Sequence, residues 1–186
     1  MVFYNIFVSL FTLSEVILLA LKRSKKAEVK SRNDSRSLLF LWVTIIICFT
    51  IGYTIARTSI GTTVDSLKFD ISGVSIIIIG FIIRWVAIIQ LADMFTVDVA
   101  ISSKHILKTD GLYKIVRHPS YLGLMLIITG LALLLNNVLS CIIIIIPFFF
   151  VLNYRISVEE KAIIREFENQ YTQYKLRVKK IIPLLY

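Results

Sequence analysis

Long apolar stretches dominate this chain of 186 residues, in which 57% of the residues are hydrophobic. Soluble chains are about 45 to 50% apolar. A helix needs roughly 20 residues to cross a bilayer core about 30 Å thick. Three stretches have about this length, and a fourth is long enough for two short crossings: residues 2–21, 38–56, 71–92 and 121–153. The sequence therefore predicts an integral membrane protein.

The fourth stretch is interrupted near its middle by Asn136 and Asn137, which predicts a helical hairpin. Its second arm contains Pro147, which a membrane helix tolerates with a kink. Only Met1 precedes the first stretch, and no cleavage pattern follows it, so we expect a retained helix. The predicted fold is an all-α bundle of about five transmembrane helices in a single domain. Residues 1–92 supply three spans, and residues 93–186 supply a polar loop, the hairpin and a C-terminal helix.

The charges of the connecting segments predict an orientation. Residues 22–36 carry seven basic side chains against two acidic ones, and residues 154–186 carry seven against four. Residues 57–70 carry two of each sign. Because basic loops stay in the cytoplasm, we expect the N-terminus outside and the C-terminus inside. The net charge of +9 then faces an anionic lipid surface, and nucleic-acid binding is not expected.

The segment after residue 154 is too charged to be a span. Its charged residues alternate with an apolar set at helical spacing: Ile163, Ile164, Phe167, Tyr171 and Tyr174. This pattern predicts an amphipathic helix. Such a helix lies in the membrane interface or folds back over the cytoplasmic end of the bundle.

Several common sites are missing from the sequence. There is no GxGxxG, P-loop, HExxH, CxxC or serine nucleophile elbow. His105 and His118 are thirteen residues apart with no carboxylate cluster beside them, so no metal site is predicted. Cys48 and Cys141 lie inside apolar runs, and we expect neither a disulfide nor a metal ligand from them.

Polar and aromatic residues instead concentrate between His105 and Gly123. Pro119 suits the first position of the fourth helix, whose free N–H groups favour an anion. The segment has two readings of equal weight. In one it is a binding site, and in the other Arg117 and His118 are interfacial anchors and Tyr113 and Tyr121 belong to an aromatic belt.

Other charged residues also allow two interpretations. Arg155 and Glu159 share one helix face, either as a surface ion pair or as a cation for an anionic group beside a carboxylate for a cationic ligand. Glu15 and Arg84 fall within predicted spans, where isolated charges are costly. For both we favour structural roles, by pairing with an opposite charge or reaching the interface, over substrate contact.

Taken together, these residues resemble the isoprenylcysteine carboxyl methyltransferase family, integral-membrane enzymes that use S-adenosylmethionine. The matching string is Gly111-x-Tyr113-x-x-x-Arg117-His118-Pro119-Ser120-Tyr121-x-Gly123, followed by Arg155, Glu159, Glu160, Phe167, Tyr171, Tyr174 and Pro183. The resemblance covers roughly the last 90 residues. It implies that the cofactor is surrounded by His105, Ile106, Leu107, Lys108, Tyr113, His118, Pro119, Ser120, Tyr121 and Glu159.

The resemblance also implies a reaction. A lipid-like or prenylated acceptor enters from the membrane, and Arg155 meets its carboxylate, which attacks the methyl group to form an ester. An arginine suits this role because it pairs with carboxylates in a bidentate manner. With an amine acceptor, as in related phospholipid methyltransferases, a proton must leave and Glu160 is the nearest candidate base.

The chain departs from the family pattern in two respects. Family members often carry a glutamine shortly before the His105 segment, where this chain has Ala100. The chain is also short, which resembles the compact prokaryotic members. Two other functions compete with methyl transfer: a sterol-type membrane reductase that binds NADPH, and a non-catalytic lipid-binding protein.

Overall fold

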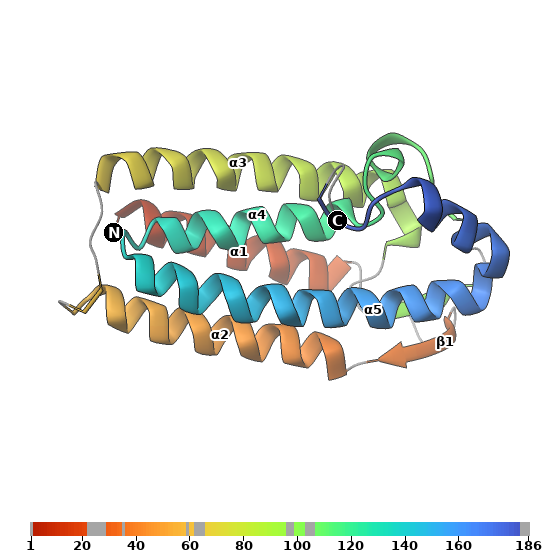
Figure 1. Cartoon of the computed structure of the whole chain (residues 1–186), viewed down its shortest axis with the longest axis horizontal. Helices are drawn as coiled ribbons and strands as arrows, with labels where there is room; N and C mark the ends of the chain where they lie inside the picture. The colour runs from red at the N-terminus through yellow and green to blue at the C-terminus, as the bar shows by residue number, and fades with distance from the viewer. Residues whose placement is uncertain are drawn as a thin grey trace.

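The computed structural model describes residues 2–21, 29–34, 36–58, 60–61, 66–95, 99–102 and 107–182. Within these residues, five α-helices run side by side along the long axis of the molecule (Figure 1). They are α1 (Val2–Leu21), α2 (Arg36–Ala56), α3 (Ser66–Leu91), α4 (Pro119–Leu133) and α5 (Val138–Arg177). All except α4 are long and apolar enough to cross a membrane. The predicted all-α membrane bundle is confirmed.

The predicted hairpin break is also confirmed, between α4 and α5. Asn136 adopts a positive φ of 54°, which an asparagine tolerates in a turn. Asn137 caps α5, because its side-chain oxygen accepts a hydrogen bond from the Ser140 N–H at 3.0 Å. Its side-chain nitrogen donates to the Ile60 carbonyl at 2.9 Å, which ties the hairpin to the residues that follow α2.

A small antiparallel sheet was not predicted. Its two strands are β1 (Val29–Asp34) and β2 (Val99–Ser102). Both strands lie outside the predicted spans. Figure 1 shows β1 beyond the start of α2, at the end of the bundle where α5 turns back. Two short 3-10 helices, η2 (Ala92–Met94) and η3 (Gly111–Lys114), lie in the chain between α3 and α4.

Four glycines bring α3 and α4 into close contact. Gly73 and Gly80 of α3 face Gly130 and Gly123 of α4. A Cβ atom at Gly130 would lie 2.6 Å from the Gly73 carbonyl oxygen, too close for any side chain. Membrane helices associate through this kind of close packing, since lipid provides no hydrophobic drive. The contact fixes the start of α4 against α3.

The helix α5 is twice as long as a membrane crossing requires. The part before Glu168 extends about 45 Å at 1.5 Å per residue, so roughly a third of it lies beyond a 30 Å core. At Glu168 the backbone leaves helical geometry, with φ 40° and ψ −113°, and the chain turns back toward the bundle (Figure 1). The predicted amphipathic segment is thus the continuation of α5, and it folds back over the bundle end.

Candidate active site

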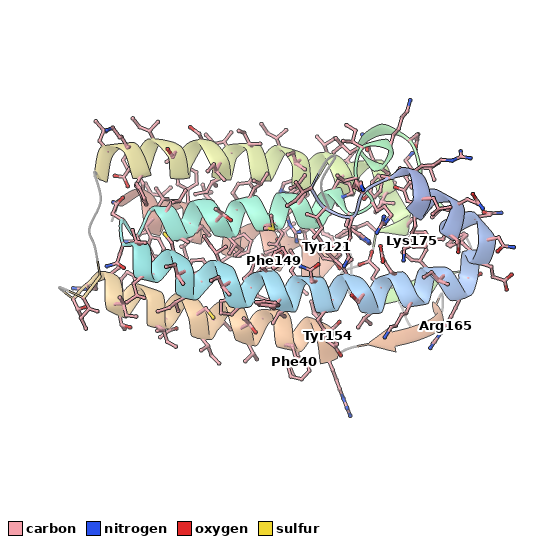
Figure 2. The ribbon with its side chains drawn as sticks, in the orientation of Figure 1. Phe40, Tyr121, Phe149, Tyr154, Arg165 and Lys175 are labelled. Atoms are coloured by element: carbon pink, nitrogen blue, oxygen red, sulfur yellow. The ribbon has the colours of Figure 1, made fainter. Side chains whose placement is uncertain are left out.

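Polar side chains gather where α3 ends, α4 begins and α5 turns back. Figure 2 labels Tyr121 on α4 and Lys175 on the returning part of α5 at this end of the bundle. Arg165, by contrast, lies near the far tip of α5. Because α4 and α5 run antiparallel, the residues around Pro119 and those beyond Tyr154 meet here although they are far apart in sequence.

The Glu160 carboxylate is the centre of this polar cluster. Its Oε1 accepts a hydrogen bond from Arg117 Nε at 2.9 Å and from the Tyr171 hydroxyl at 3.0 Å, and it lies 3.2 Å from His118 Nε2. Lys175 Nζ is 3.4 Å from Oε2. Glu160 is the 23rd residue of α5, past the roughly 20 residues that a crossing requires. Burial alone would raise its pKa, but the hydrogen bond and charge of His118, together with Arg117 and Lys175, hold the pKa well below its usual range.

The returning C-terminal segment holds Arg117 and His118 in place. Their backbone N–H groups donate to the carbonyls of Lys179 at 2.8 Å and Lys180 at 3.1 Å. The Arg117 side chain also donates to the Val178 carbonyl at 2.5 Å. The orientation of His118 therefore depends on a segment about sixty residues later in the chain.

Glu159 faces a different direction from its neighbour. Successive residues of a helix point about 100° apart, so Glu160 is buried while the Glu159 side chain remains 30% exposed. The Tyr121 hydroxyl donates to Glu159 Oε2 at 2.6 Å, and His118 Nδ1 lies 3.7 Å from Oε1. Glu159 thus presents a carboxylate that is already oriented by Tyr121.

Arg155 lies one helical turn before Glu159 and is buried, with 3% of its surface exposed. Its Nη1 donates to the Ser37 hydroxyl at 2.9 Å, across to the first turn of α2. It also interacts with Tyr121. This burial does not fit the interpretation of Arg155 and Glu159 as an exposed surface ion pair.

A pocket that is partly open to solvent lies beside this cluster. Of the residues predicted to surround a cofactor, the pocket is lined by Leu107, Lys108, Tyr113, His118 and Glu159. Pro119, Ser120 and Tyr121 form the adjoining first turn of α4 and are not among the lining residues. His105 and Ile106 lie outside the described residues, as does Pro183, and the side chain of Ala100 is not described either.

The burial of Tyr113 and His118 argues against their interpretation as interfacial residues. Tyr113 and His118 are 7% and 5% exposed, which does not suit an aromatic belt or an interfacial anchor. The Tyr113 hydroxyl donates to the Ala87 carbonyl at 3.3 Å, and its own carbonyl accepts from the Tyr174 hydroxyl. Burial, with the nearby charge of Glu159, raises the pKa of Tyr113, so the phenol stays protonated and can donate.

Six lining residues were not predicted as cofactor contacts. They are Leu91, Arg117, Ile163, Phe167, Tyr171 and Tyr174. The last four occupy one face of the amphipathic segment, at spacings of four, four and three residues. That spacing predicted an apolar face, but it did not reveal that the kink at Glu168 would carry Tyr171 and Tyr174 back over the pocket.

The fold and the site define a class: a polytopic helical membrane protein with a polar, aromatic-lined pocket at one end of its bundle. The model of the isoprenylcysteine carboxyl methyltransferase (ICMT) family matches residues 73–165, half of the chain. The chain therefore belongs to this family, as the sequence predicted.

Individual relatives agree with this assignment. The chain is similar to the protein-S-isoprenylcysteine O-methyltransferase of Schizosaccharomyces pombe, with 32% identity over 63% of this chain and 50% of the relative. It is 36% identical to that of Saccharomyces cerevisiae over 61% of this chain and 48% of the relative. Enzyme B of Arabidopsis thaliana is 34% identical over 61% and 58%. The chain thus spans about half the length of the curated relatives it matches.

A solved structure shares the fold. The eukaryotic intramembrane Ras methyltransferase ICMT superposes with a TM-score of 0.61 and 27% sequence identity, covering 82% of this chain and 54% of that one. The match extends beyond residues 73–165 and therefore includes part of the chain that the family model leaves out.

Proposed function

We propose that this chain is an integral-membrane methyltransferase that binds S-adenosylmethionine in the pocket and methylates the carboxylate of a lipid-like acceptor. The observation that carries the proposal is the position of Glu159, an oriented carboxylate between the pocket and the buried Arg155. The names of the relatives, which are isoprenylcysteine O-methyltransferases, support the same reaction.

The lining of the pocket fits S-adenosylmethionine. The cofactor carries an ammonium, a carboxylate, a sulfonium and an adenine ring. Glu159 suits the ammonium, and Lys108 and His118 suit the carboxylate. Tyr113 and Phe167 suit the adenine or, through cation–π attraction, the sulfonium.

We also assign to the cofactor site the other predicted residues, which lie next to pocket-lining residues in the chain. Pro119 and Ser120 form the first turn of α4, and Tyr121 orients Glu159 from that turn. We assign His105 and Ile106 to the same pocket because they directly precede Leu107, which lines it. All the described residues that line the pocket come after residue 93, except Leu91, which ends α3.

The chain's own residues account for the transfer step. When bound, the cofactor supplies a methyl group activated by a positively charged sulfur. A carboxylate acceptor is ionised at neutral pH, so it needs no general base. Arg155 binds that carboxylate and aligns it, while the surrounding helices exclude water from both charges.

The environment of Glu160 favours a carboxylate over an amine as acceptor. An amine would need a base to take its proton, and Glu160 was the candidate. Its carboxylate is occupied by Arg117, His118 and Tyr171, and its pKa is low, which makes it a weak base. We therefore assign Glu160 to positioning these side chains.

The charges of the connecting segments support an orientation with the N-terminus outside and the pocket on the cytoplasmic side. In that orientation the cofactor enters from the cytoplasm, and the acceptor arrives from the surrounding lipid. A prenylated acceptor agrees with the names of the relatives. Binding of NADPH, as in a sterol-type reductase, has no support from the family match.

The proposal is tested by incubating the protein in lipid nanodiscs with methyl-labelled S-adenosylmethionine and an S-farnesyl cysteine derivative. We expect label in the lipid product, and release of that label as methanol when alkali hydrolyses the ester. The C-terminal amide of the same acceptor is the matched control and should gain no label. Label that resists alkali would instead show methylation of nitrogen and would contradict the choice of acceptor.

A further inference from the structure

A buried ion pair joins α1 to α3. Arg84 Nε donates to Glu15 Oε1 at 2.8 Å, and Arg84 Nη2 donates to Glu15 Oε2 at 2.9 Å. The two side chains are 7% and 5% exposed. Both residues lie within helices of membrane-spanning length, where an unpaired charge is costly. Of the two structural roles predicted for them, pairing is observed, and they pair with each other.

The remaining donor of the Arg84 guanidinium reaches the candidate active site. Its Nη1 lies 3.2 Å from the Ser120 carbonyl oxygen and 3.3 Å from the Ser120 hydroxyl. Ser120 precedes Tyr121 in the first turn of α4. The two helices are in close contact at this point, because a Cβ atom at Gly123 would lie 2.6 Å from the Arg84 backbone nitrogen.

We propose that the Glu15–Arg84 pair positions the first turn of α4, so that Tyr121 holds Glu159 in the orientation that binds the cofactor. This inference rests on the proposed function. The chain of contacts runs from Glu15 through Arg84 to Ser120, and from the next residue, Tyr121, to Glu159 at 2.6 Å. Arg84 and Glu15 are positioning residues, since neither lines the pocket.

A purely structural role does not require this arrangement. A buried ion pair is often no more stabilising than well-packed apolar residues of the same size. The glycine contacts already hold α3 against α4. What an apolar pair does not provide is a directional hydrogen bond to the Ser120 carbonyl and hydroxyl. Glu15 lies outside residues 73–165, so the proposal also gives α1 a part in the site that the family match does not describe.

The test uses two variants of the full chain in nanodiscs. The double variant Glu15→Gln with Arg84→Met removes both charges together. The single variant Arg84→Lys keeps a positive charge to pair with Glu15, but it lacks the planar guanidinium that contacts Glu15 and Ser120 at the same time. We expect both to bind S-adenosylhomocysteine about tenfold more weakly, which is the lower end of the loss seen when residues that orient metal ligands are removed. The KM for the acceptor should change less than the affinity for S-adenosylhomocysteine. Although Arg155 interacts with Tyr121, it is also held by the Ser37 hydroxyl at 2.9 Å, which lies outside this chain of contacts. Arg57→Met is the matched control, because Arg57 is exposed and contacts Tyr53 near the C-terminal end of α2. This variant should bind S-adenosylhomocysteine as the wild type does.

Hydrogen exchange of the amides of Tyr121 and Leu122, which both donate to the His118 carbonyl, supplies a readout that needs no ligand. Faster exchange there in both variants, with an unchanged melting temperature, supports positioning. Wild-type exchange and wild-type affinity in a folded variant would overturn it. If the double variant does not fold, Arg84→Lys decides. If the wild-type protein itself binds no S-adenosylhomocysteine, the proposed function fails, whereas the exchange rates still decide whether the pair orders this turn.

Discussion

Replacing Glu159 by alanine is expected to weaken the binding of S-adenosylhomocysteine by about ten- to one-hundredfold. The carboxylate lines the pocket, and the Tyr121 hydroxyl orients it. A hydrogen bond to a charged group contributes about 1.5 to 3 kcal/mol, which corresponds to this loss in affinity. The effect should appear in calorimetric titration of the purified protein, with little change in its melting temperature, because the Glu159 side chain is partly exposed.

Two further variants sharpen the interpretation. Glu159→Gln keeps the acceptor for Tyr121 but removes the charge, so it should recover only part of the affinity. Glu166→Ala is the matched control, since Glu166 lies on the same helix and does not line the pocket. Wild-type affinity in Glu159→Ala would remove Glu159 from the site.

Replacing Arg155 by alanine is expected to lower kcat/KM for a carboxylate acceptor by about one-hundredfold and to change S-adenosylhomocysteine affinity less than about threefold. A bidentate arginine–carboxylate contact is among the stronger charged hydrogen bonds, and in the proposed site Arg155 makes this contact with the acceptor and not with the cofactor. Arg155 does not line the pocket, whereas Glu159, one turn later, does. Initial rates at saturating cofactor, with the acceptor varied, measure the effect.

The control for this variant comes from α2. Arg155 also donates to the Ser37 hydroxyl, so its removal disturbs the packing of α5 against α2. Ser37→Ala removes that contact alone and should lower kcat/KM only slightly. Full turnover by Arg155→Ala would leave Arg155 with a packing role, and an equal loss in Ser37→Ala would attribute the effect to packing.

The helices of this protein can be predicted from its sequence because the signals that define them are local. An apolar run of about 20 residues predicts a span, and Asn136 and Asn137 interrupt the fourth run at the position of a turn. Pro119 begins α4 as predicted, since it fits the first turn of a helix and interrupts any later one. The strands β1 and β2 escaped prediction because they pair across about 70 residues and carry no alternating pattern.

The site can be predicted only in part, because the packing of α5 against α4 is not a local property of the sequence. Three residues of the string around His118 line the pocket: Tyr113, Arg117 and His118. Of the charged residues Arg155, Glu159 and Glu160, Glu159 alone lines it. Which glutamate faces the pocket depends on the rotation of α5, and sequence spacing does not fix that rotation against α4.

Long-range pairing is the other part that sequence does not supply. Glu15 and Arg84 were each recognised as charges that need partners, but 69 residues separate them and nothing local couples them. In the same way, the hydrogen bond from Arg117 to the Val178 carbonyl depends on the kink at Glu168, which brings the C-terminal segment back toward α4. No residue pattern predicts this kink.

The central claim is that the pocket binds S-adenosylmethionine, and calorimetric titration with S-adenosylhomocysteine tests it most directly. The purified protein is titrated with this product and, in parallel, with NADPH, alongside a Tyr121→Ala variant that removes the partner of Glu159. We predict saturable binding of S-adenosylhomocysteine alone, and its loss or strong weakening in the variant. A folded protein that binds neither ligand, or binds NADPH in its place, would contradict the assignment of this pocket to methyl transfer.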